Sequence, residues 1–346
     1  MLMEQTTGQV LFEQNADEKL PPASITKVMT MLLVMEAIDA GRLSLEDKVT
    51  CSPHANSMGG TQIWLEIGEQ MTVHELLKAV ATVSANDAAV ALAEHLAGSE
   101  EGFAELMNQR AAQLGMENTH FVNASGLDAE GHLTTARDIA IMSCELMKHP
   151  KVTEYTTIWM DSLRDGKTQL VNTNKLVRFY KGATGLKTGT TDGAGHCLSA
   201  TATRGNLSLV AVTLGSASGD ERFSNTRALL DYGFANYDAV TTPDISDQLT
   251  PIKVLGGVEE SVQPVYDCPP VIIVPKGGKD TISQEVTLAE SLKAPVDQGQ
   301  KVGTVVVLVD KVKAGEYTLR AEKEVPAMDL ARAFGFLWTA MITMVR

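Results

Sequence analysis

The sequence predicts an α+β fold: an antiparallel sheet with helices packed against it, followed by a small domain of strands. Apolar residues recur at helical spacing over much of residues 24–147, and the spacing changes to a strand-like alternation after residue 185. A short strand precedes the helices, so strands from both ends of one domain flank them in sequence. From about residue 243 the apolar segments are strand-like and are separated by Gly, Pro and Asp.

The first domain is predicted to span residues 1–242 and to open with a strand at Gly8–Glu13. A helix then begins at Ser24, just after two prolines, and it is apolar nearly all round, as a helix buried in the centre of a domain would be. Further helices are expected at residues 73–83, 87–98, 101–114 and 135–147.

The alternating segments that follow predict the sheet. Strands are expected at residues 186–188, 197–203 and 207–214, with a turn at Arg204-Gly205-Asn206 between the last two. A further helix at residues 222–237 is expected to cover this sheet.

The second domain, residues 243–326, is predicted to be all-β because it carries β-branched runs at residues 271–274, 286–288 and 305–309. The last twenty residues, 327–346, place apolar side chains at helical spacing and predict an amphipathic tail helix. Such a helix could lie on a membrane surface. It could instead pack against a partner, because membrane-surface helices normally carry more basic residues than Arg332 and Arg346.

Composition excludes several classes of protein. At 346 residues the chain is long enough for two domains, each with a core. A formal net charge of −14 argues against nucleic acid as a partner, because most of the surface would repel a polyanion. No run of 18 apolar residues is present, so an integral membrane protein is not expected.

The cysteines and the first residues bear on the cellular compartment. Cys51, Cys144, Cys197 and Cys268 are far apart and are expected to be free, mostly buried thiols, with one disulfide as the alternative. The first residues, M-L-M-E-Q, lack the basic and apolar regions of an export signal. By itself this indicates either a cytoplasmic protein or the start of a mature or engineered exported one.

Three short motifs suggest chemistry. An S-x-x-K motif, Ser24 to Lys27, opens the first buried helix, and an S-x-N motif, Ser84 to Asn86, lies at the junction of two predicted helices. A K-T-G motif at residues 187–189 lies on a predicted strand. Each motif is common by itself, so the inference depends on their order and their structural contexts together.

These residue types suit catalysis by a serine nucleophile. Residues three apart in a helix share a face, so Ser24 and Lys27 are expected to lie within hydrogen-bond reach. Burial and the charge of Lys187 would lower the pKa of Lys27, which could then accept the serine proton. Ser84 can relay protons to the leaving group, and Asn86 can orient Lys27 or bind a substrate carbonyl.

The K-T-G strand is the expected substrate-binding segment. Lys187 and Thr188 offer a cation and a hydroxyl to a substrate carboxylate, and Gly189 and Thr190 continue the segment. The backbone N–H groups of Ser24 and Thr190 are the expected donors to a developing oxyanion. No metal or cofactor is expected, because the sequence has no C-x-x-C motif and no Cys/His cluster at zinc spacing.

Each residue also has a simpler interpretation. Ser24 could be a helix cap, Ser84 a loop residue, Asn86 the cap of the next helix and Lys187 a charge on an edge strand. The combination of all four in order favours catalysis. The histidines lack catalytic motifs and are predicted to be structural; His132 is the first exception to consider, because it falls in a predicted loop.

With these motifs, the sequence resembles the D-alanyl-D-alanine carboxypeptidases, which are low-molecular-weight penicillin-binding proteins of the serine peptidase class, and it is similar to their sporulation-associated Gram-positive type. The resemblance covers nearly the whole chain. Beyond the three motifs it rests on residues 22–30, 84–88, 121–127 and 185–191.

The resemblance implies removal of the terminal D-Ala from peptidoglycan stem pentapeptides through an acyl-enzyme on Ser24, which penicillin would also acylate. It implies a serine β-lactamase/transpeptidase-like domain, a β-rich C-terminal domain, and a tail helix on the outer face of the membrane. The expected partners are therefore the stem peptide, β-lactam antibiotics and, through residues 327–346, the membrane surface. The location would be extracytoplasmic, which favours the mature or engineered start.

Two alternatives remain. A serine β-lactamase shares the nucleophile, the lysine and the K-T-G motif, and the motif spacing suits either enzyme. The glutamate context E-x-x-L-N of the class A β-lactamases is absent between Asn86 and Lys187, and a secreted lactamase has no use for the second domain. A non-catalytic cell-wall-binding relative would have no need to retain both Ser24 and Lys27.

Overall fold

The computed structural model describes residues 1–266, 271–277 and 282–330. The chain divides into two compact units, Met1–Asp238 and Ala239–Arg346. We describe each unit by itself, starting with the one that contains the three motifs.

A five-stranded antiparallel sheet forms the middle layer of the N-terminal unit, with the strand order β2-β1-β9-β8-β7. Its strands are β1 (Leu2–Glu4), β2 (Val10–Phe12), β7 (Ala183–Thr191), β8 (Gly195–Arg204) and β9 (Leu207–Ser216). Strands from the start and the end of the unit therefore pair, and β7, which carries the K-T-G motif, lies at an edge. The predicted α+β arrangement is confirmed.

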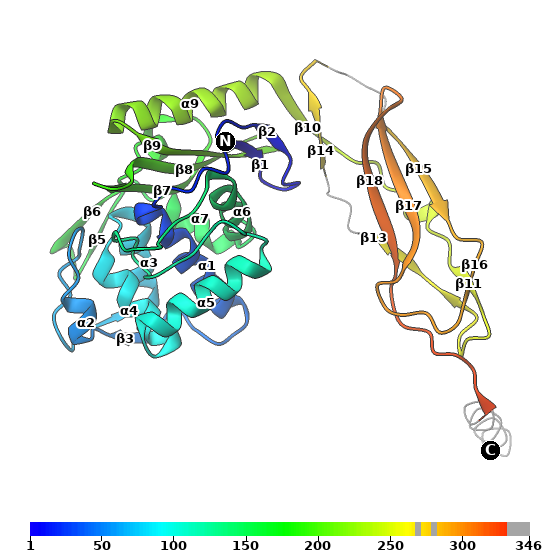
Figure 1. The fold of residues 1–346 in the computed structure, drawn as a ribbon, viewed down its shortest axis with the longest axis horizontal. Helices are drawn as coiled ribbons and strands as arrows, with labels where there is room; N and C mark the ends of the chain where they lie inside the picture. Colours follow the sequence, from blue (N-terminus) through cyan, green and yellow to red (C-terminus); the bar gives the residue numbers. More distant parts are fainter. Residues whose placement is uncertain (267–270, 278–281, 331–346) are drawn as a thin grey trace. The chain divides into compact units, whose positions relative to one another are not determined.

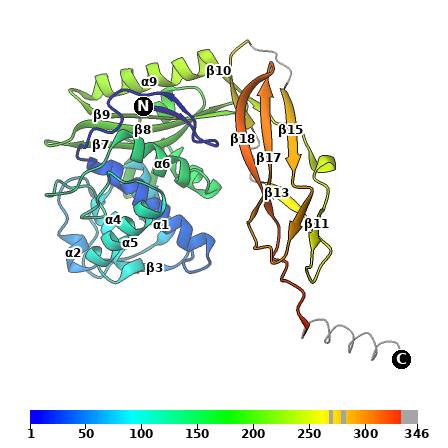
Figure 2. The same cartoon turned by 45° about the vertical axis from the view of Figure 1, so that its right-hand side comes forward.

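Helices cover both faces of this sheet. Figure 1 shows α9 (Gly219–Asn236) along one face and the other long helices on the opposite face, and Figure 2 shows the same layers after a 45° turn. The helices of the opposite layer are α1 (Lys27–Asp39), α3 (Val73–Thr82), α4 (Asn86–Ala97), α5 (Glu100–Gln113) and α6 (Ala136–Leu146). They begin and end close to the predicted bounds.

Side-chain caps explain where several helices begin. Thr72 and Glu75 form a capping box at the start of α3, in which each side chain accepts a hydrogen bond from the other residue's backbone N–H. Ser99, Thr135 and Ser218 cap α5, α6 and α9 in the simpler way, through one side-chain oxygen. Helix α1 has no such cap, because the short 3₁₀ helix η1 (Ala23–Thr26) leads directly into it.

Several short elements escaped the sequence analysis. Strand β1 is only three residues long, yet Leu2 within it is fully buried between β2 and β9. Two two-stranded ribbons and four short helices were also missed, since each is too short to show a period. They are β3 (Lys48–Thr50) with β4 (Gln70–Thr72), β5 (Met160–Leu163) with β6 (Thr168–Val171), α2 (Pro53–Asn56), η2 (Pro150–Val152), α7 (Thr153–Thr156) and α8 (Leu176–Phe179).

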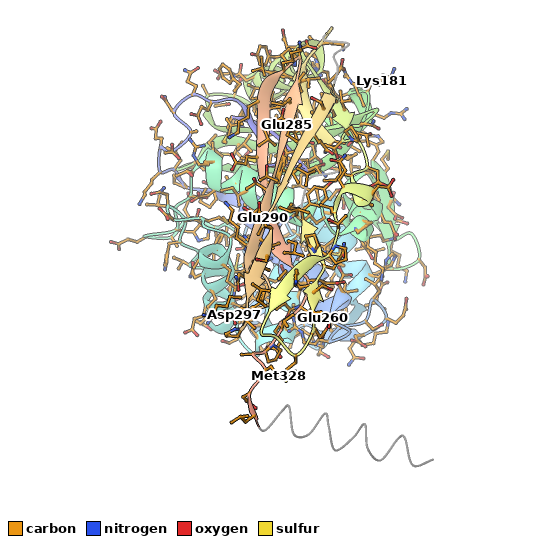
Figure 3. All side chains as sticks on the ribbon, turned by 90° about the vertical axis from the view of Figure 1, so that its right-hand side faces the viewer. Lys181, Glu260, Glu285, Glu290, Asp297 and Met328 are labelled. Carbon is orange, nitrogen blue, oxygen red and sulfur yellow. The ribbon has the colours of Figure 1, made fainter. Side chains whose placement is uncertain are left out.

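In its described residues, the C-terminal unit consists of strands around a core of its own and the short helix η3 (Ser246–Gln248). Its sheets have the orders β10-β14, β12-β11-β16 and β13-β18-β17-β15. The strands are β10 (Tyr237–Thr241), β11 (Ile252–Leu255), β12 (Ser261–Val262), β13 (Pro264–Tyr266), β14 (Val271–Pro275), β15 (Ile282–Leu288), β16 (Ser291–Lys293), β17 (Lys301–Val309) and β18 (Val312–Ala321). Acidic side chains of this unit, such as Glu260, Glu285, Glu290 and Asp297, are labelled in Figure 3.

Two expectations fall partly outside the described residues. Residues 331–346, which make up most of the predicted tail helix, lie outside them, and so does Cys268. The other three cysteines are free and buried. No helix within the described ranges is long and apolar enough to cross a membrane.

Candidate active site

The S-x-x-K motif forms a tight turn at the start of the central helix. Ser24 lies in η1 and Lys27 is the first residue of α1, so the two side chains face the same side of one turn. Lys27 Nζ lies 3.0 Å from Ser24 Oγ. Lys27 has no exposed surface, whereas Ser24 is partly exposed. The predicted hydroxyl–amine pair is therefore present, with the hydroxyl on the accessible side.

Two further oxygen atoms surround the Lys27 amine. Asn86 Oδ1 and the backbone carbonyl of Ser125 each accept a hydrogen bond from Nζ at 2.6 Å. Asn86 is the first residue of α4, and Ser125 lies in the loop that precedes α6. The amine therefore joins three segments that are far apart in the sequence.

The pKa values of the two motif lysines, Lys27 and Lys187, are both lowered. Burial lowers the pKa of Lys27 well below its ordinary value, and the charge of Lys187 lowers it further, while Asp87 and Glu100 act in the opposite direction. Burial, and then the charge of Arg222, lowers the pKa of Lys187 to about 7. Below that pH, Lys187 keeps its charge and so favours the neutral form of Lys27.

The Asn86 side chain is held by the loop that precedes β4. The backbone N–H of Asn86 donates to Thr61 O at 2.7 Å, and the side-chain Nδ2 of Asn86 donates to Gly59 O, also at 2.7 Å. Gly60 lies at φ +73°, and a methyl group there would lie 2.9 Å from Asn86 Nδ2. The loop thus fixes the amide so that its oxygen, the only acceptor on the side chain, faces Lys27.

Ser84 has an unusual environment. Its backbone adopts φ +69°, which serine seldom does, and its side chain is almost fully buried. Among the described residues, Oγ of Ser84 has no hydrogen-bond partner. The structure therefore leaves this buried hydroxyl, two residues before Asn86, available to a ligand or a proton.

The K-T-G strand lies directly against the serine turn. A methyl group on Gly189 would lie 3.0 Å from Ala23 Cβ and 3.1 Å from the backbone nitrogen of Ser24, so glycine permits this approach. Lys187 is buried and donates to Thr188 O at 3.0 Å. The Thr188 hydroxyl donates to Thr173 Oγ1 at 2.7 Å.

A buried arginine of α9 donates hydrogen bonds to Gly189 and Thr190 of β7. Arg222 of α9 donates from Nη1 to Gly189 O and to Thr190 Oγ1, both at 3.1 Å. The same nitrogen donates to Cys197 O of β8 at 3.3 Å. Sequence reasoning missed Arg222, because nothing in its local sequence distinguishes it from other helix arginines.

The Ser125 carbonyl was also not anticipated as a partner of Lys27, although residues 121–127 were part of the resemblance. Gly126 shows how closely this loop packs: it adopts φ +84°, and a methyl group there would lie 1.9 Å from Ala23 O. The glycine after Ser125 is thus required by the contact between the loop and the serine turn.

His132 joins the same loop to the serine turn, and among the described residues no hydrogen bond links it to Ser24. Its Nδ1 accepts from Val122 N–H at 2.9 Å, so the ring proton is on Nε2, which lies 2.8 Å from Thr26 Oγ1. Burial lowers the pKa of His132 to about 4, so the ring is neutral at neutral pH. Within the described residues its role is structural.

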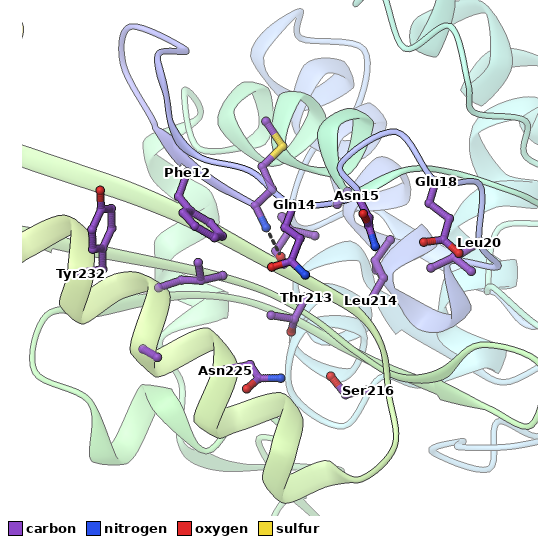
Figure 4. A pocket seen from close by; sticks show the side chains of 15 residues that line it. Phe12, Gln14, Asn15, Glu18, Leu20, Thr213, Leu214, Ser216, Asn225 and Tyr232 are labelled. Atoms are coloured by element: carbon purple, nitrogen blue, oxygen red, sulfur yellow. Dashed lines mark hydrogen bonds between the residues drawn. The ribbon is translucent and has the colours of Figure 1, made fainter.

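The motif residues lie outside the cavity shown in Figure 4. A cavity of about 650 Å³ lies between β9, α9 and the segment after β2, and it contains none of the motif residues (Figure 4). Over the described ranges, no group of three or more His, Cys, Asp or Glu residues could hold a metal ion.

Comparison with protein-family models identifies two matches. Residues 1–218 match the model described as D-alanyl-D-alanine carboxypeptidase, a peptidase family. Residues 237–327 match the model of the C-terminal domain of penicillin-binding protein 5.

Individual proteins agree with these matches. The chain is 42% identical to D-alanyl-D-alanine carboxypeptidase DacF of Bacillus subtilis over 342 residues, which cover 97% of this chain and 86% of that protein. The structure of penicillin-binding protein 5 from Haemophilus influenzae superposes with a TM-score of 0.82 at 31% identity, covering 94% of this chain and 96% of the other. Penicillin-binding protein D2 of Listeria monocytogenes, determined in an ampicillin-bound form, matches 67% of this chain and 95% of its own, with 36% identity and a TM-score of 0.62.

Proposed function

Because the chain belongs to the D-alanyl-D-alanine carboxypeptidase family of serine peptidases, we propose that Ser24 is the nucleophile of this carboxypeptidase and Lys27 its general base. The observation that carries the proposal is the arrangement of three oxygen atoms around the Lys27 amine. The family and its activity follow from the comparisons, whereas the roles of individual residues are our assignment.

The arrangement suits a neutral amine. A neutral lysine has two N–H donors and one lone pair, and Asn86 Oδ1 and Ser125 O, which are acceptors only, take the two donors. The lone pair then faces Ser24 Oγ, 3.0 Å away, and can take the hydroxyl proton as the oxygen attacks the carbonyl carbon. The pKa of Lys27, which burial lowers well below its ordinary value, favours this neutral form.

The attack creates an oxyanion and a leaving amine, and both need a partner. We assign the backbone N–H groups of Ser24 and Thr190 to the oxyanion, supported by the close packing of Gly189 on the Ser24 nitrogen. We assign Ser84 to proton transfer toward the leaving D-alanine, because its hydroxyl is buried and unpartnered among the described residues. Breakage of the peptide bond releases D-alanine and leaves an ester on Ser24, which water then hydrolyses.

The carboxylate of the leaving D-alanine requires a cation. We propose that Lys187 and the Thr188 hydroxyl bind it, since β7 places them on the strand that packs against the serine turn. This cation also keeps Lys27 neutral, so one lysine serves both the substrate and the base.

The same site explains reaction with β-lactams. A β-lactam presents a strained amide and a carboxylate, which match the two groups that Ser24 and Lys187 would meet in the peptide. The Listeria relative was determined in an ampicillin-bound form, and we propose acylation of Ser24 for this chain. We further propose that the protein acts outside the cytoplasm and that residues 327–346 contact the membrane surface, on the basis of their apolar residues at helical spacing.

A single experiment separates the carboxypeptidase from the β-lactamase alternative. The protein is expected to release D-alanine from a peptide ending in D-Ala-D-Ala and to carry a penicilloyl adduct that persists for an hour by intact-mass spectrometry. A lactamase would instead regenerate the free protein and consume the penicillin. Absence of D-alanine release together with rapid penicillin turnover would overturn the assignment.

The pKa of Lys187 leads to a pH dependence. A lysine keeps its charge below its pKa, which burial and then Arg222 lower to about 7. For a peptide with a free terminal carboxylate, kcat/KM is therefore expected to fall as pH rises through about 7. The fall in kcat is expected at a higher pH than the fall in kcat/KM, because the bound substrate carboxylate favours the charged form of Lys187 and so raises its pKa in the complex. Initial rates across pH 5–10 measure both.

The control for this prediction is Lys187→Gln with two substrates. This substitution is expected to lower kcat/KM by about 10- to 100-fold for the peptide with a free terminal carboxylate, because a charged hydrogen bond is lost. It is expected to lower kcat/KM by less for the corresponding terminal amide. Equal losses on both substrates would mean that Lys187 acts on Lys27 and not on the substrate.

A further inference from the structure

Trp64 is an exposed aromatic residue in the loop that holds the catalytic amide. Its residue surface is 73% exposed, and its backbone adopts φ +60°, a conformation that bulky residues seldom occupy. The loop lies between α2 and β4, and earlier in the same loop Gly59 O and Thr61 O bind Asn86.

The backbone on both sides of Trp64 is fixed by charged side chains. The carboxylate of Asp87 accepts from Ile63 N–H at 3.1 Å and from Leu65 N–H at 3.0 Å. Arg164, from the turn between β5 and β6, donates to Ile63 O at 2.9 Å. These bonds hold the left-handed turn, and so the outward position of the indole.

The indole lines a hollow of about 470 Å³ together with polar side chains. The other lining residues are Asn56, Met58, Gln62, Leu65 and Glu66. Within the described part of the chain, no hydrogen bond joins the Gln62 amide to another residue, and the Glu66 carboxylate is exposed, with its charge acting on Arg164. An aromatic face next to an unbonded amide and an exposed carboxylate suits a ligand with apolar C–H faces and with hydroxyl or amide groups at its edges.

The hollow is close to the catalytic amide. Thr61 O accepts from Asn86 N–H at 2.7 Å, and three residues of extended chain span at most about 10 Å, so Trp64 lies within that reach of Thr61. The peptidoglycan substrate is a stem peptide attached to a glycan strand of N-acetylated hexosamines. A sugar ring has apolar faces and polar edges, which match the chemistry of the hollow.

We propose that Trp64, with Gln62 and Glu66, binds an N-acetylated hexosamine ring of the glycan strand that carries the stem peptide. This inference rests on the proposed function. The indole stacks on one face of the ring, and the amide and carboxylate bind its hydroxyl and acetamido groups. The enzyme thus recognises peptides attached to glycan better than free peptides.

The test compares two substrates that share one stem pentapeptide, free in one and linked to a disaccharide in the other. For Trp64→Ala, the ratio of kcat/KM for the linked substrate to that for the free substrate is expected to fall by up to about tenfold, the upper end of what one aromatic contact contributes. Trp64→Phe is expected to recover part of the ratio. Ile67→Ala, a change at a residue of the same loop that is 62% exposed and does not line the hollow, is expected to leave it unchanged.

A binding measurement without catalysis completes the test. Trp159→Phe and Trp338→Phe leave Trp64 as the only tryptophan of the chain's three. Titration with chitotetraose is expected to change its fluorescence, and Gln62→Ala to weaken the binding. An unchanged substrate ratio in Trp64→Ala, which includes equal losses on both substrates, would overturn the inference, as would the absence of a fluorescence response in the protein whose only tryptophan is Trp64. If the wild type releases no D-alanine from the free pentapeptide, the proposed function fails, and the titration still tests the hollow.

Discussion

Replacing Ser24 with alanine is expected to abolish both D-alanine release and covalent labelling by a fluorescent penicillin. Ser24 Oγ is the only oxygen of the turn that lies 3.0 Å from the buried Lys27 amine while its residue stays partly exposed. Removing it deletes the atom that forms the ester, so the loss in kcat should be about 10⁴-fold or more. The measurements are D-alanine release from a D-Ala-D-Ala peptide and in-gel fluorescence after labelling.

The fold should survive this change, because a partly exposed hydroxyl at the start of α1 contributes little packing. An unchanged thermal midpoint would show that the loss is chemical. Ser44→Ala, at an exposed serine of the same unit, is the matched control and should retain full labelling. Labelling that survives in Ser24→Ala would place the nucleophile elsewhere.

Lys27→Met is expected to lower the rate of acylation about 10³-fold, for the peptide and for penicillin alike. Methionine fills nearly the same volume and is tolerated in a buried position, so packing around α1 is preserved. What is lost is the amine that takes the serine proton. Stopped-flow acylation by a chromogenic β-lactam measures the rate.

The pH profile distinguishes a base from a merely structural lysine. In the wild type, the acylation rate should rise with pH as Lys27 loses its proton, with the midpoint well below the ordinary lysine pKa, chiefly because of burial. This rise should be absent in Lys27→Met. Lys151→Met, at an exposed lysine, is the control. A variant at Lys27 that reacts at nearly the wild-type rate, or that keeps the rise, would contradict the assignment of the base.

How far the fold could be predicted depended on the length of each element. The long helices and the strands β8 and β9 repeat their apolar residues over several periods, and their positions were predicted closely. Strand β1, the ribbons and the four-residue helices are too short to show a period. They exist because neighbouring elements complete their hydrogen bonds, as β9 and β2 do for β1.

The candidate site shows the same division. The pairing of Ser24 with Lys27 follows from one helical turn, and the sequence predicted it. The bond from Lys27 to the Ser125 carbonyl joins residues 98 positions apart and uses a backbone atom, which no residue type reveals. Arg222 contacts Gly189 O only because α9 packs across β8 and β9 and the arginine reaches the neighbouring strand β7, and sequence reasoning had no means to select it.

By itself, the sequence determined the nucleophile and base candidates, the long helices and the family resemblance, because each depends on residue type at short, regular spacing. Only the tertiary structure decided which oxygen atoms surround Lys27, that the charge of Lys187 acts on it, and where the loop exposes Trp64. These features depend on packing between distant segments and on burial, which sets the pKa of both lysines. A local sequence pattern does not show which distant segments pack together or which side chains they bury.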